Sequence, residues 1–365
     1  MTNNNISKIL DLRFPFTFIL SSFFLLSFIF LLVSCDTTEP NGDNGNNEPD
    51  TTSQNFTFES FEFGDGYSSS YFNDVWVFDE NNIWAVGWVR PAPKTGGIHN
   101  IVRWDGNEWS GLGGQFTSSG LYGIWAEDTS DIFFAAGAVI RYKSGEFTEY
   151  NLGHLGFSQG QSVQKLWGSG ADNIWGVGPW GTIVHFNGSE WSKIDYDTSW
   201  VFKDICSGFN DRLFAIAHNL FSSNVIILEF LQNKIDTLYT DLYTDRINVH
   251  WQQISNPVMN KIWLAGNGIW QLDINSGSLS QIYTGEYGIA INVMSDKNAN
   301  DIYFGGTHID DEFYLGHYNG NNFTEILRDA YNHHVPGGIS SDAHIAAYGG
   351  RRENNGYLIL IRRFE

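Results

Sequence analysis

The feature of this sequence that most constrains its fold is a motif that returns about every 44 residues. Each copy is a short apolar run that ends in a glycine or alanine, as in NIWGVG, which ends at Gly178. Seven copies occur, and they end at Gly87, Gly137, Gly178, Ala217, Gly266, Gly306 and Gly349. The intervals between them are 50, 41, 39, 49, 40 and 43 residues. A period of this length indicates an array of similar structural units.

Each period also carries the signals of four short strands. One large or apolar residue precedes every copy in a shared register, at Trp76, Trp125, Trp167, Cys206, Ile254, Met294 and Ile339. A turn signal follows most copies, in RWDGNEW, RYKSGEF, HFNGSEW, LDINSGS and HYNGNNF. Asn-Gly or Asp-Gly between alternating runs is typical of a tight hairpin. Around Gly178 the strands are expected at 164–168, 173–177, 182–186 and from 190 onward.

Four strands every 40 to 50 residues are typical of one blade of a β-propeller. The copy WGSGADNIWGVG resembles the W-G-S-G-x-x-D-I-W-x-V-G units of many exported bacterial propeller proteins, a group near the Asp-box and sialidase-like propellers. The resemblance is weakest in the fourth copy, and it implies a fold rather than one activity. We therefore predict an all-β, seven-bladed β-propeller with four antiparallel strands in each blade.

The two ends of the repeat region predict how the ring closes. The last copy has room for three strands, near 338–341, 343–348 and 357–364, and a fourth is missing. The segment NFTFESFEF, at 55–63, precedes the first copy and alternates between apolar and polar residues as a strand does. Pairing this N-terminal strand beside 357–364 would close the last blade and remove two exposed sheet edges.

The residues before position 55 indicate export and attachment to a membrane. Residues 1–34 carry Lys8 and Arg13 and then a long apolar run, the pattern of a signal peptide. The run ends in Leu-Val-Ser before Cys35, which is similar to the lipobox of bacterial lipoproteins and implies cleavage before Cys35 and a lipid on its thiol. A single membrane-spanning helix is the alternative. The expected location is the bacterial cell envelope, at the outer membrane.

The segment between Cys35 and the repeats differs in composition from the signal peptide and from the repeat region. Residues 35–54 contain no large apolar side chain and are rich in Asn, Asp, Gly, Pro and Thr. Such a segment buries too little to order itself, so a flexible tether is expected. A propeller domain at 55–365 follows it.

Composition narrows the possible partners. The chain has 41 acidic and 20 basic residues, a net charge of −21, and no basic stripe, which excludes nucleic acid as the expected partner. Cys206 is the one cysteine besides Cys35, so the propeller cannot hold a disulfide framework. G-x-S-x-G, H-E-x-x-H and a phosphate-binding loop are all absent from the sequence. No cofactor or resident metal is expected.

Residues that repeat are expected to serve the fold. Trp84, Trp175 and Trp263 recur at one strand position, and we predict that they fill the core between blades. A second recurring position, on the third strand of the blades, holds Arg103, Arg141, Arg363, His185 and His317. This repetition indicates a structural role for these basic residues rather than a catalytic arginine cluster.

Residues that break the repeat are expected to serve function. Insertions gather in the loops after the second and the fourth strand of each blade, and these loops emerge on one face because neighbouring strands are antiparallel. We call this the variable face. Its candidate ligand-binding residues are Trp88, Arg90, His99, Trp180, His308, Asp310, Tyr331, His333, His334, Arg351 and Arg352.

These candidates have different chemistry. Trp180, in the tight turn GPWG, is either an exposed stacking platform or packing between blades. His333 and His334 make a poor metal site, because adjacent residues of an extended loop point in different directions. The acidic run 310–312 offers calcium ligands, although a solvated acidic loop accounts for it better. Arg351 and Arg352 form a basic pair suited to a carboxylate or a phosphate.

Together these features favour a non-catalytic module that binds an extracytoplasmic protein or glycan through the variable face. One alternative is a glycan-cleaving enzyme with its site at the propeller axis, although the sialidase motif Phe-Arg-Ile-Pro is absent. The other is a scaffold of an envelope complex. An axial pocket ringed by carboxylates would favour the enzyme, and a flat aromatic face would favour binding.

Overall fold

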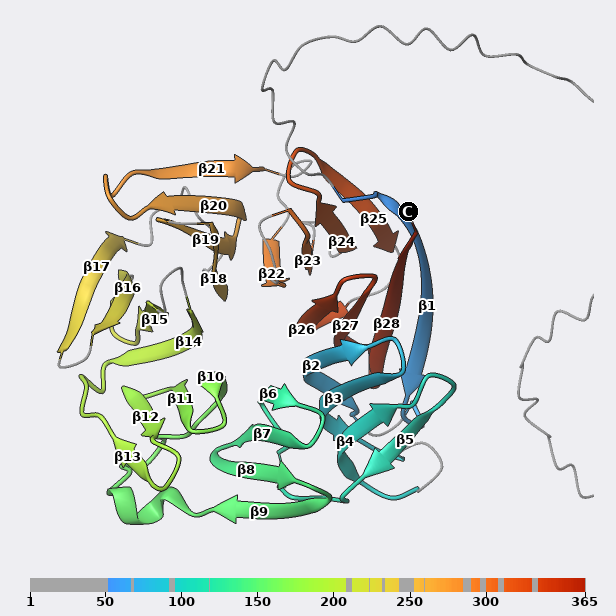
Figure 1. Cartoon of the computed structure of the whole chain (residues 1–365), viewed down its shortest axis with the longest axis horizontal. Coiled ribbons are helices and arrows are strands. Elements are labelled where there is room, and N and C mark those ends of the chain that lie inside the picture. The colour runs from blue at the N-terminus through green and yellow to red at the C-terminus, as the bar shows by residue number, and fades with distance from the viewer. Residues whose placement is uncertain are drawn as a thin grey trace, which may run out of the picture. The chain divides into compact units, whose positions relative to one another are not determined.

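The computed structural model describes residues 52–66, 69–91, 96–117, 119–207, 212–222, 224–231, 234–242, 253–258, 260–284, 290–295, 300–307, 312–329 and 334–364. All of them belong to one compact unit, Asn47–Glu365. They form seven four-stranded antiparallel sheets arranged in a ring (Figure 1). The prediction of a seven-bladed β-propeller is confirmed. Within these residues, no helix is long and apolar enough to cross a membrane.

Each blade is one sheet, and its strands follow one another along the chain in blades one to six. Blade one has β2 (Tyr71–Asp79), β3 (Asn82–Val89), β4 (His99–Trp104) and β5 (Trp109–Leu112). Blade two has β6 (Gly123–Asp128), β7 (Asp131–Ala136), β8 (Ala138–Lys143) and β9 (Glu146–Tyr150). Blade three has β10 (Lys165–Gly170), β11 (Asn173–Gly178), β12 (Thr182–Phe186) and β13 (Trp191–Lys193). Blade four has β14 (Trp200–Ser207), β15 (Leu213–Asn219), β16 (Asn224–Leu231) and β17 (Lys234–Leu242).

The remaining blades follow the same order. Blade five has β18 (Gln253–Val258), β19 (Lys261–Gly266), β20 (Gly268–Asp273) and β21 (Leu279–Tyr283). Blade six has β22 (Ala290–Met294), β23 (Ile302–Thr307), β24 (Phe313–Tyr318) and β25 (Phe323–Asp329). Blade seven has β26 (His334–Asp342), β27 (Ile345–Arg352), β28 (Asn355–Phe364) and β1 (Asn55–Phe63). The first strand of each blade lies nearest the centre of the ring, and the fourth lies at the rim (Figure 1).

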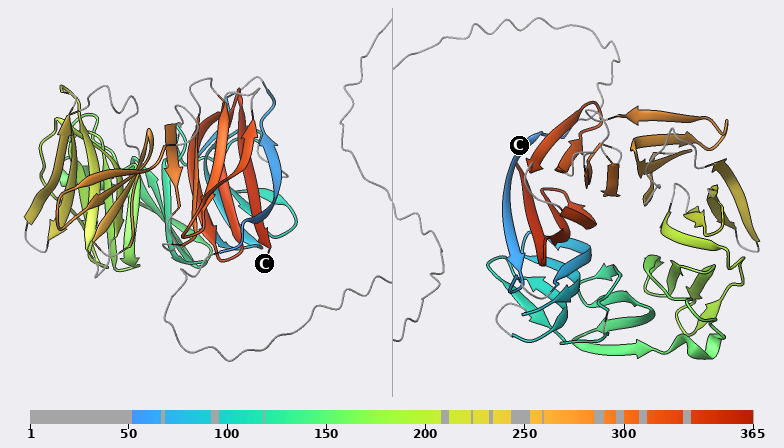
Figure 2. Two further views of the ribbon diagram at one scale, coloured as in Figure 1. Left: turned by 90° about the horizontal axis from the view of Figure 1, so that it is seen from above. Right: turned by 180° about the vertical axis from the view of Figure 1, so that it is seen from behind.

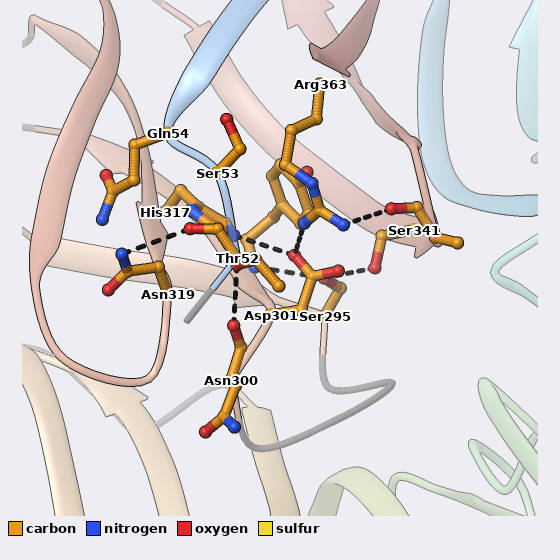
Figure 3. A network of polar contacts seen from close by, with 12 residues as sticks. Thr52, Ser53, Gln54, Ser295, Asn300, Asp301, His317, Asn319, Ser341 and Arg363 are labelled. Carbon is orange, nitrogen blue, oxygen red and sulfur yellow. Dashed lines mark hydrogen bonds and ion pairs between the residues drawn. The ribbon is translucent and has the colours of Figure 1, made fainter. Parts of the chain in front are cut away.

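The ring closes as the ends of the repeat region predict. Strand β1 pairs antiparallel with β28 along its whole length, from Asn55 opposite Phe364 to Phe63 opposite Gly356 (Figures 1 and 2). The residues before β1 reach further, onto blade six. The Thr52 hydroxyl donates to the carbonyl of Asn300 at 2.8 Å, and the amide of Asn319 donates to the carbonyl of Thr52 at 3.3 Å (Figure 3).

The position of Thr52 identifies a face of the disc. Asn300 lies in the turn between the first and second strands of blade six, and Asn319 lies in the hairpin between its third and fourth strands. Because adjacent strands are antiparallel, these two kinds of turn share the face opposite the variable face. We call it the turn face. The chain therefore enters the propeller from the turn face.

Aromatic residues pack between neighbouring blades. Trp84 is 1% exposed, and its ring centroid lies 5.3 Å from that of Tyr142 in blade two. Trp263 is buried in the same way against Tyr318 in blade six, also at 5.3 Å. The predicted core role holds for both. Trp175 differs, because it is partly exposed although its ring contacts Phe230 of blade four at 5.4 Å.

The recurring third-strand residues form polar latches within blades one to six. In a latch, a second-strand residue pairs with a third-strand residue. The second-strand partner lies two positions before the repeated aromatic residue, and the third-strand partner lies opposite that aromatic residue in the sheet. The latches of this kind are Asn82–Arg103 at 2.8 Å, Asp131–Arg141 at 2.6 Å, Asn173–His185 at 2.7 Å, Lys261–Gln271 at 2.8 Å and Asp301–His317 at 2.8 Å. Blade four reverses the charges, with Arg212 and Glu229 at 2.5 Å. The structural interpretation of this repeat fits these contacts.

Arg363 does not belong to this pattern. The equivalent position in blade seven is Leu360, opposite Ala347. Arg363 instead pairs with Asp301 of blade six and donates to the carbonyl of Ala343 (Figure 3). No hairpin follows β28, so the sequence offers no turn signal to fix its register.

The repeat register is also one residue off in the last three blades. Paired strands place Gly350, not Gly349, opposite the start of the inner strand in blade seven. The inner-strand positions equivalent to Trp76 are Ser255, Ser295 and Ser340, each one residue after Ile254, Met294 and Ile339. A search for apolar residues misses these serines, and the hydroxyls of Ser295 and Ser340 form contacts between blades. Ser295 bonds Ser341 at 3.0 Å, and Ser340 accepts from the N–H of Val77 at 3.1 Å.

Candidate functional site

Bulges turn inner-strand side chains toward the propeller axis. The inner strands of blades one, four, six and seven each have a register shift at the same place, between residues 72 and 74, 202 and 204, 291 and 293, and 336 and 338. A bulge inserts one residue that has no partner on the neighbouring strand, and it redirects that side chain. The inserted residues are Asn73, Lys203, Asn292 and Gly337.

Three of the four inserted residues line one pocket of about 170 Å³. We call it the axial pocket, and its lining residues are Lys165, Lys203, Gln253, Asn292, Val293, Pro336 and Gly337. Each of these residues lies on the inner strand of one of five blades. Each is close to the beginning of that strand, which pairs with the end of the second strand. Those ends lie at the variable face, so the pocket belongs to the variable-face end of the axis.

Two aspartates stand beside the lysines of the pocket. The Lys165 amine lies 3.4 Å from Asp74 Oδ2. Burial acts to lower the pKa of Lys165, but the charges of Asp74 and Asp204 outweigh it and raise that pKa. Asp204 is 8% exposed, and burial raises its pKa to about 7, against the opposing effect of Lys165. The pocket thus adjoins a carboxyl group that titrates near neutral pH.

Both aspartates also tie one blade to the next. Asp74 Oδ2 accepts a hydrogen bond from the N–H of Ile124 at 3.3 Å, and Asp204 Oδ2 accepts one from the N–H of Ile254 at 3.1 Å. Gln253 Oε1 accepts in the same way from the N–H of Met294. These bonds give the two carboxylates a structural role at the axis, whatever else they do.

Lys203 and Asn292 are less satisfied. Lys203 is partly buried, and burial lowers its pKa. Within the described part of the chain, no acidic side chain lies within 4.0 Å of its amine. The buried Oδ1 of Asn292 has no hydrogen-bond partner among the described residues. A buried polar group without a partner is costly, so Lys203 gains from a hydrogen-bond acceptor in the pocket and Asn292 Oδ1 gains from a donor.

An exposed apolar patch lies on the variable face of blades three and four. Its members are Trp180, 39% exposed, Leu220, 42% exposed, and Phe221, 78% exposed. Their loops are linked through the segment 199–200, since the N–H of Leu220 donates to the carbonyl of Ser199 and that of Gly181 donates to Trp200, each at 2.7 Å. We call this the apolar patch.

The backbone around Trp180 supports its display. Trp180 has φ 56° and Gly181 has φ 67°, and the N–H of Thr182 donates to the carbonyl of Pro179 at 3.2 Å, as in a two-residue type I′ turn. A tryptophan in this left-handed region is unusual and carries strain. Contacts with the loop before β10 hold the turn, because Gln161 Nε2 donates to the carbonyl of Trp180 at 2.9 Å.

The other predicted residues do not gather into one site. Trp88 lies opposite Tyr71 in the sheet of blade one, and the charge of Arg351 in blade seven acts on the same tyrosine. Arg352 is already paired with Glu62 at 2.7 Å.

Those remaining positions have simple environments. His99 Nδ1 accepts from the N–H of Gly114 at 3.2 Å, and Arg90 is exposed just after β3. Strand β26 begins at His334, but its side chain is outside the described atoms. The positions Cys35, His308, Asp310, Tyr331 and His333 lie outside the described residues. Among the residues that are described, no group of three His, Cys, Asp or Glu side chains could hold a metal ion.

A second concavity lies between blades three and four at the rim. It is a groove of about 500 Å³ lined by Trp175, Ile194, Asp195, Tyr196, Phe230, Leu231, Lys234 and Ile235. Trp175 of blade three and Phe230 of blade four, whose ring centroids lie 5.4 Å apart, both line it. His185 stacks on Trp175 with ring centroids 4.3 Å apart, and burial lowers the pKa of His185.

Sequence reasoning missed the axial pocket and two of the three residues of the apolar patch. Lys203 and Asn292 occupy inserted positions, and a bulge leaves no mark in the alternation of a strand. Leu220 and Phe221 had a visible signal, since two apolar residues follow β15 in the loop segment NLFSSN. The fourth copy matches the repeat poorly, so the sequence pattern does not show where its second strand ends and this loop begins.

No protein-family model matches the sequence, and no curated protein matches it. Many solved structures share the fold. YCF48 bound to D1 peptide has a TM-score of 0.59 at 10% identity, over 86% of this chain and 99% of that chain. The WD40 propeller domain of Doa1 has a TM-score of 0.56 at 14% identity, over 84% of this chain and 96% of that chain.

A third similar structure is an extracellular one. The extracellular domain of a putative one-component system from B. thetaiotaomicron has a TM-score of 0.60 at 12% identity, over 85% of this chain and 40% of that chain. Identities this low show a shared fold and nothing finer. The fold defines the chain as a seven-bladed β-propeller, a class whose members commonly act as binding modules.

Proposed function

We propose that this chain is a lipoprotein of the bacterial cell envelope, anchored through Cys35, whose propeller binds a protein or glycan partner without catalysis. The observation that carries the proposal is the apolar patch on the variable face. Its most exposed member, Phe221, has 78% of its surface in contact with solvent. Exposed aromatic side chains on a rigid scaffold are typical anchors of binding interfaces.

The entry of the chain at the turn face supports this arrangement. Thr52 is held by Asn300 and Asn319 on the turn face (Figure 3). The first described residues, 52–54, therefore lie on the face opposite the loops, and this segment leaves the variable face unobstructed.

The chemistry of the axial pocket supports binding over glycan cleavage. A glycan-cleaving site needs two carboxyl groups that face the scissile bond. The pocket is lined by lysine and carboxamide side chains, and Asp74 and Asp204 are not among its lining residues. Both aspartates are engaged by backbone N–H groups of the next blade.

A protein is the partner that we favour. YCF48, which shares the fold, is bound to a peptide in its solved structure. An apolar patch that includes Leu220 and Phe221 also suits a protein surface better than a sugar, because an aliphatic side chain offers no face on which a sugar ring stacks.

Site-specific photo-crosslinking in intact cells tests the proposal. A photoreactive residue at position 221 is expected to yield a discrete crosslinked product, identified by mass spectrometry. The matched control is position 190, an exposed glutamate in the hairpin between β12 and β13 on the turn face. Equal crosslinking from both positions, or none from position 221, would contradict the proposal.

A further inference from the structure

We propose that the axial pocket binds a carboxylate group, with Lys203 as its principal cation. The inference rests on the proposed binding function of the variable face and names the chemistry of one of its ligands. Four polar side chains line the pocket: Lys165, Lys203, Gln253 and Asn292. Two are ammonium groups and two are carboxamides, so hydrogen-bond donors outnumber acceptors in the lining.

The two lysines differ in what already neutralises them. Lys165 has Asp74 at 3.4 Å and also lies in the field of Asp204. Among the described residues, no carboxylate lies within 4.0 Å of Lys203. The bulge between Phe202 and Asp204 turns Lys203 into the pocket. Lys203 is therefore the cation whose charge is left for a ligand.

The charge balance favours a ligand with a single negative charge. One anionic group neutralises Lys203, whereas a dianion such as phosphate would place excess negative charge next to Asp74 and Asp204. Partial burial strengthens the ion pair, because the surroundings screen it less than water does. The carboxamides of Gln253 and Asn292 can donate to the second oxygen of a carboxylate.

The size of the pocket limits the ligand. A cavity of roughly 150 Å³ holds a molecule the size of benzene. At about 170 Å³, the axial pocket accommodates a carboxylate with two or three carbon atoms, such as acetate or the end of a glutamate side chain. A free small acid and an acidic side chain of a bound protein share this chemistry.

Isothermal titration calorimetry on the full-length chain in uncharged detergent tests the site. The probes are acetate, a capped Gly-Glu-Gly peptide and phosphate, with methyl acetate and the Gly-Gln-Gly peptide as uncharged counterparts. We expect a carboxylate probe to bind more tightly than its uncharged counterpart and than phosphate. Tighter binding of the peptide than of acetate would indicate a protein source, and the reverse would indicate a free small acid.

Variants locate the binding. Lys203→Gln is expected to weaken binding of the carboxylate probe about tenfold or more, because a charge-assisted hydrogen bond is lost. Lys203→Arg is expected to retain most of it. The matched control Lys143→Gln removes a lysine that is 60% exposed in blade two, and it should leave binding unchanged. An equal loss in both Gln variants would overturn the assignment.

A second measurement needs no variant. Reductive methylation followed by mass spectrometry reports how fast each lysine reacts. A saturating carboxylate probe should slow the labelling of Lys203 and leave that of Lys143 unchanged. Absence of carboxylate binding, or no protection of Lys203, would overturn the inference. Crosslinking from position 221 would still stand on its own, so the failure of this site and the failure of the proposed function are distinguishable.

Discussion

Asp204→Asn should change how the stability of this propeller depends on pH. The carboxyl group is 8% exposed, and burial raises its pKa from 3.8 to about 7. The folded state therefore binds this proton more tightly than the unfolded chain does. The contribution of Asp204 to stability is fully present below about pH 4, is lost as pH rises toward 7, and stays lost above that.

The size of the effect follows from the shift. Roughly three pKa units at 1.36 kcal/mol each correspond to about 4 kcal/mol, which is an upper bound. Asparagine keeps an oxygen that can accept from the N–H of Ile254, as Asp204 does at 3.1 Å. It also removes a negative charge that favours the protonated form of Lys165, which reduces the gain. We expect the variant to gain about 1 to 4 kcal/mol over the parent between pH 4 and pH 8.

Urea unfolding curves at several pH values between 4 and 8 measure this difference directly. Asp195→Asn is the matched control, because the Asp195 side chain is 96% exposed. The control should follow the parent at every pH. A difference between Asp204→Asn and the parent that stays constant from pH 4 to pH 8 would refute the reasoning, since burial would then not govern this group.

Three further predictions concern the anchor, the closure and the tryptophans. Cys35→Ser should abolish lipidation and the cleavage before residue 35, as measured by mass spectrometry of the membrane fraction; a parent protein that carries no lipid and keeps residues 1–34 would contradict the predicted anchor. Deleting 55–63 should expose β28 and promote aggregation, measured by light scattering, and a monomeric variant with an unchanged melting temperature would argue against closure. Trp84→Ala should cost about 3 to 5 kcal/mol in urea unfolding, whereas Trp180→Ala should cost about 1 kcal/mol or less. Equal losses would mean that Trp180 belongs to the core.

The sequence was sufficient for the ring because its signals are redundant. Seven markers, the hairpin turns and an orphan strand at 55–63 all require the same fold, so small register errors do no harm. In blade three the strands lie within two residues of the positions expected. Single positions have no such redundancy. Trp175 shares its motif with Trp84 but is partly exposed, and it lines the groove between blades three and four.

The candidate site was harder to predict because it depends on the exact register of the inner strands, which one extra residue changes. A one-residue slip in an inner strand assigns every side chain to the wrong face of its sheet, and so to the wrong neighbouring blade. The slips at Ile254, Met294 and Ile339 made that exchange in three blades. The loops of the variable face were recognisable as insertions, but the inward turn of Lys203 comes from a bulge inside a strand.

The latches and blade-to-blade bonds give a physical reason for a ligand at the axis. Arg141 is neutralised by Asp131 at 2.6 Å, and Asp74 accepts from Ile124, so repeated polar groups satisfy one another within the scaffold. Polar groups that pair within the scaffold stabilise the ring, but they keep no unpaired donor or acceptor with which to bind a partner. Lys203 and Asn292 depart from it at the variable-face end of the axis. Their desolvation costs stability without a compensating partner in the described chain, and a carboxylate would supply the missing partner of Lys203. Removing the partly buried charge of Lys203 should therefore stabilise the free protein. We expect Lys203→Met to raise the melting temperature of the free protein and to abolish carboxylate binding.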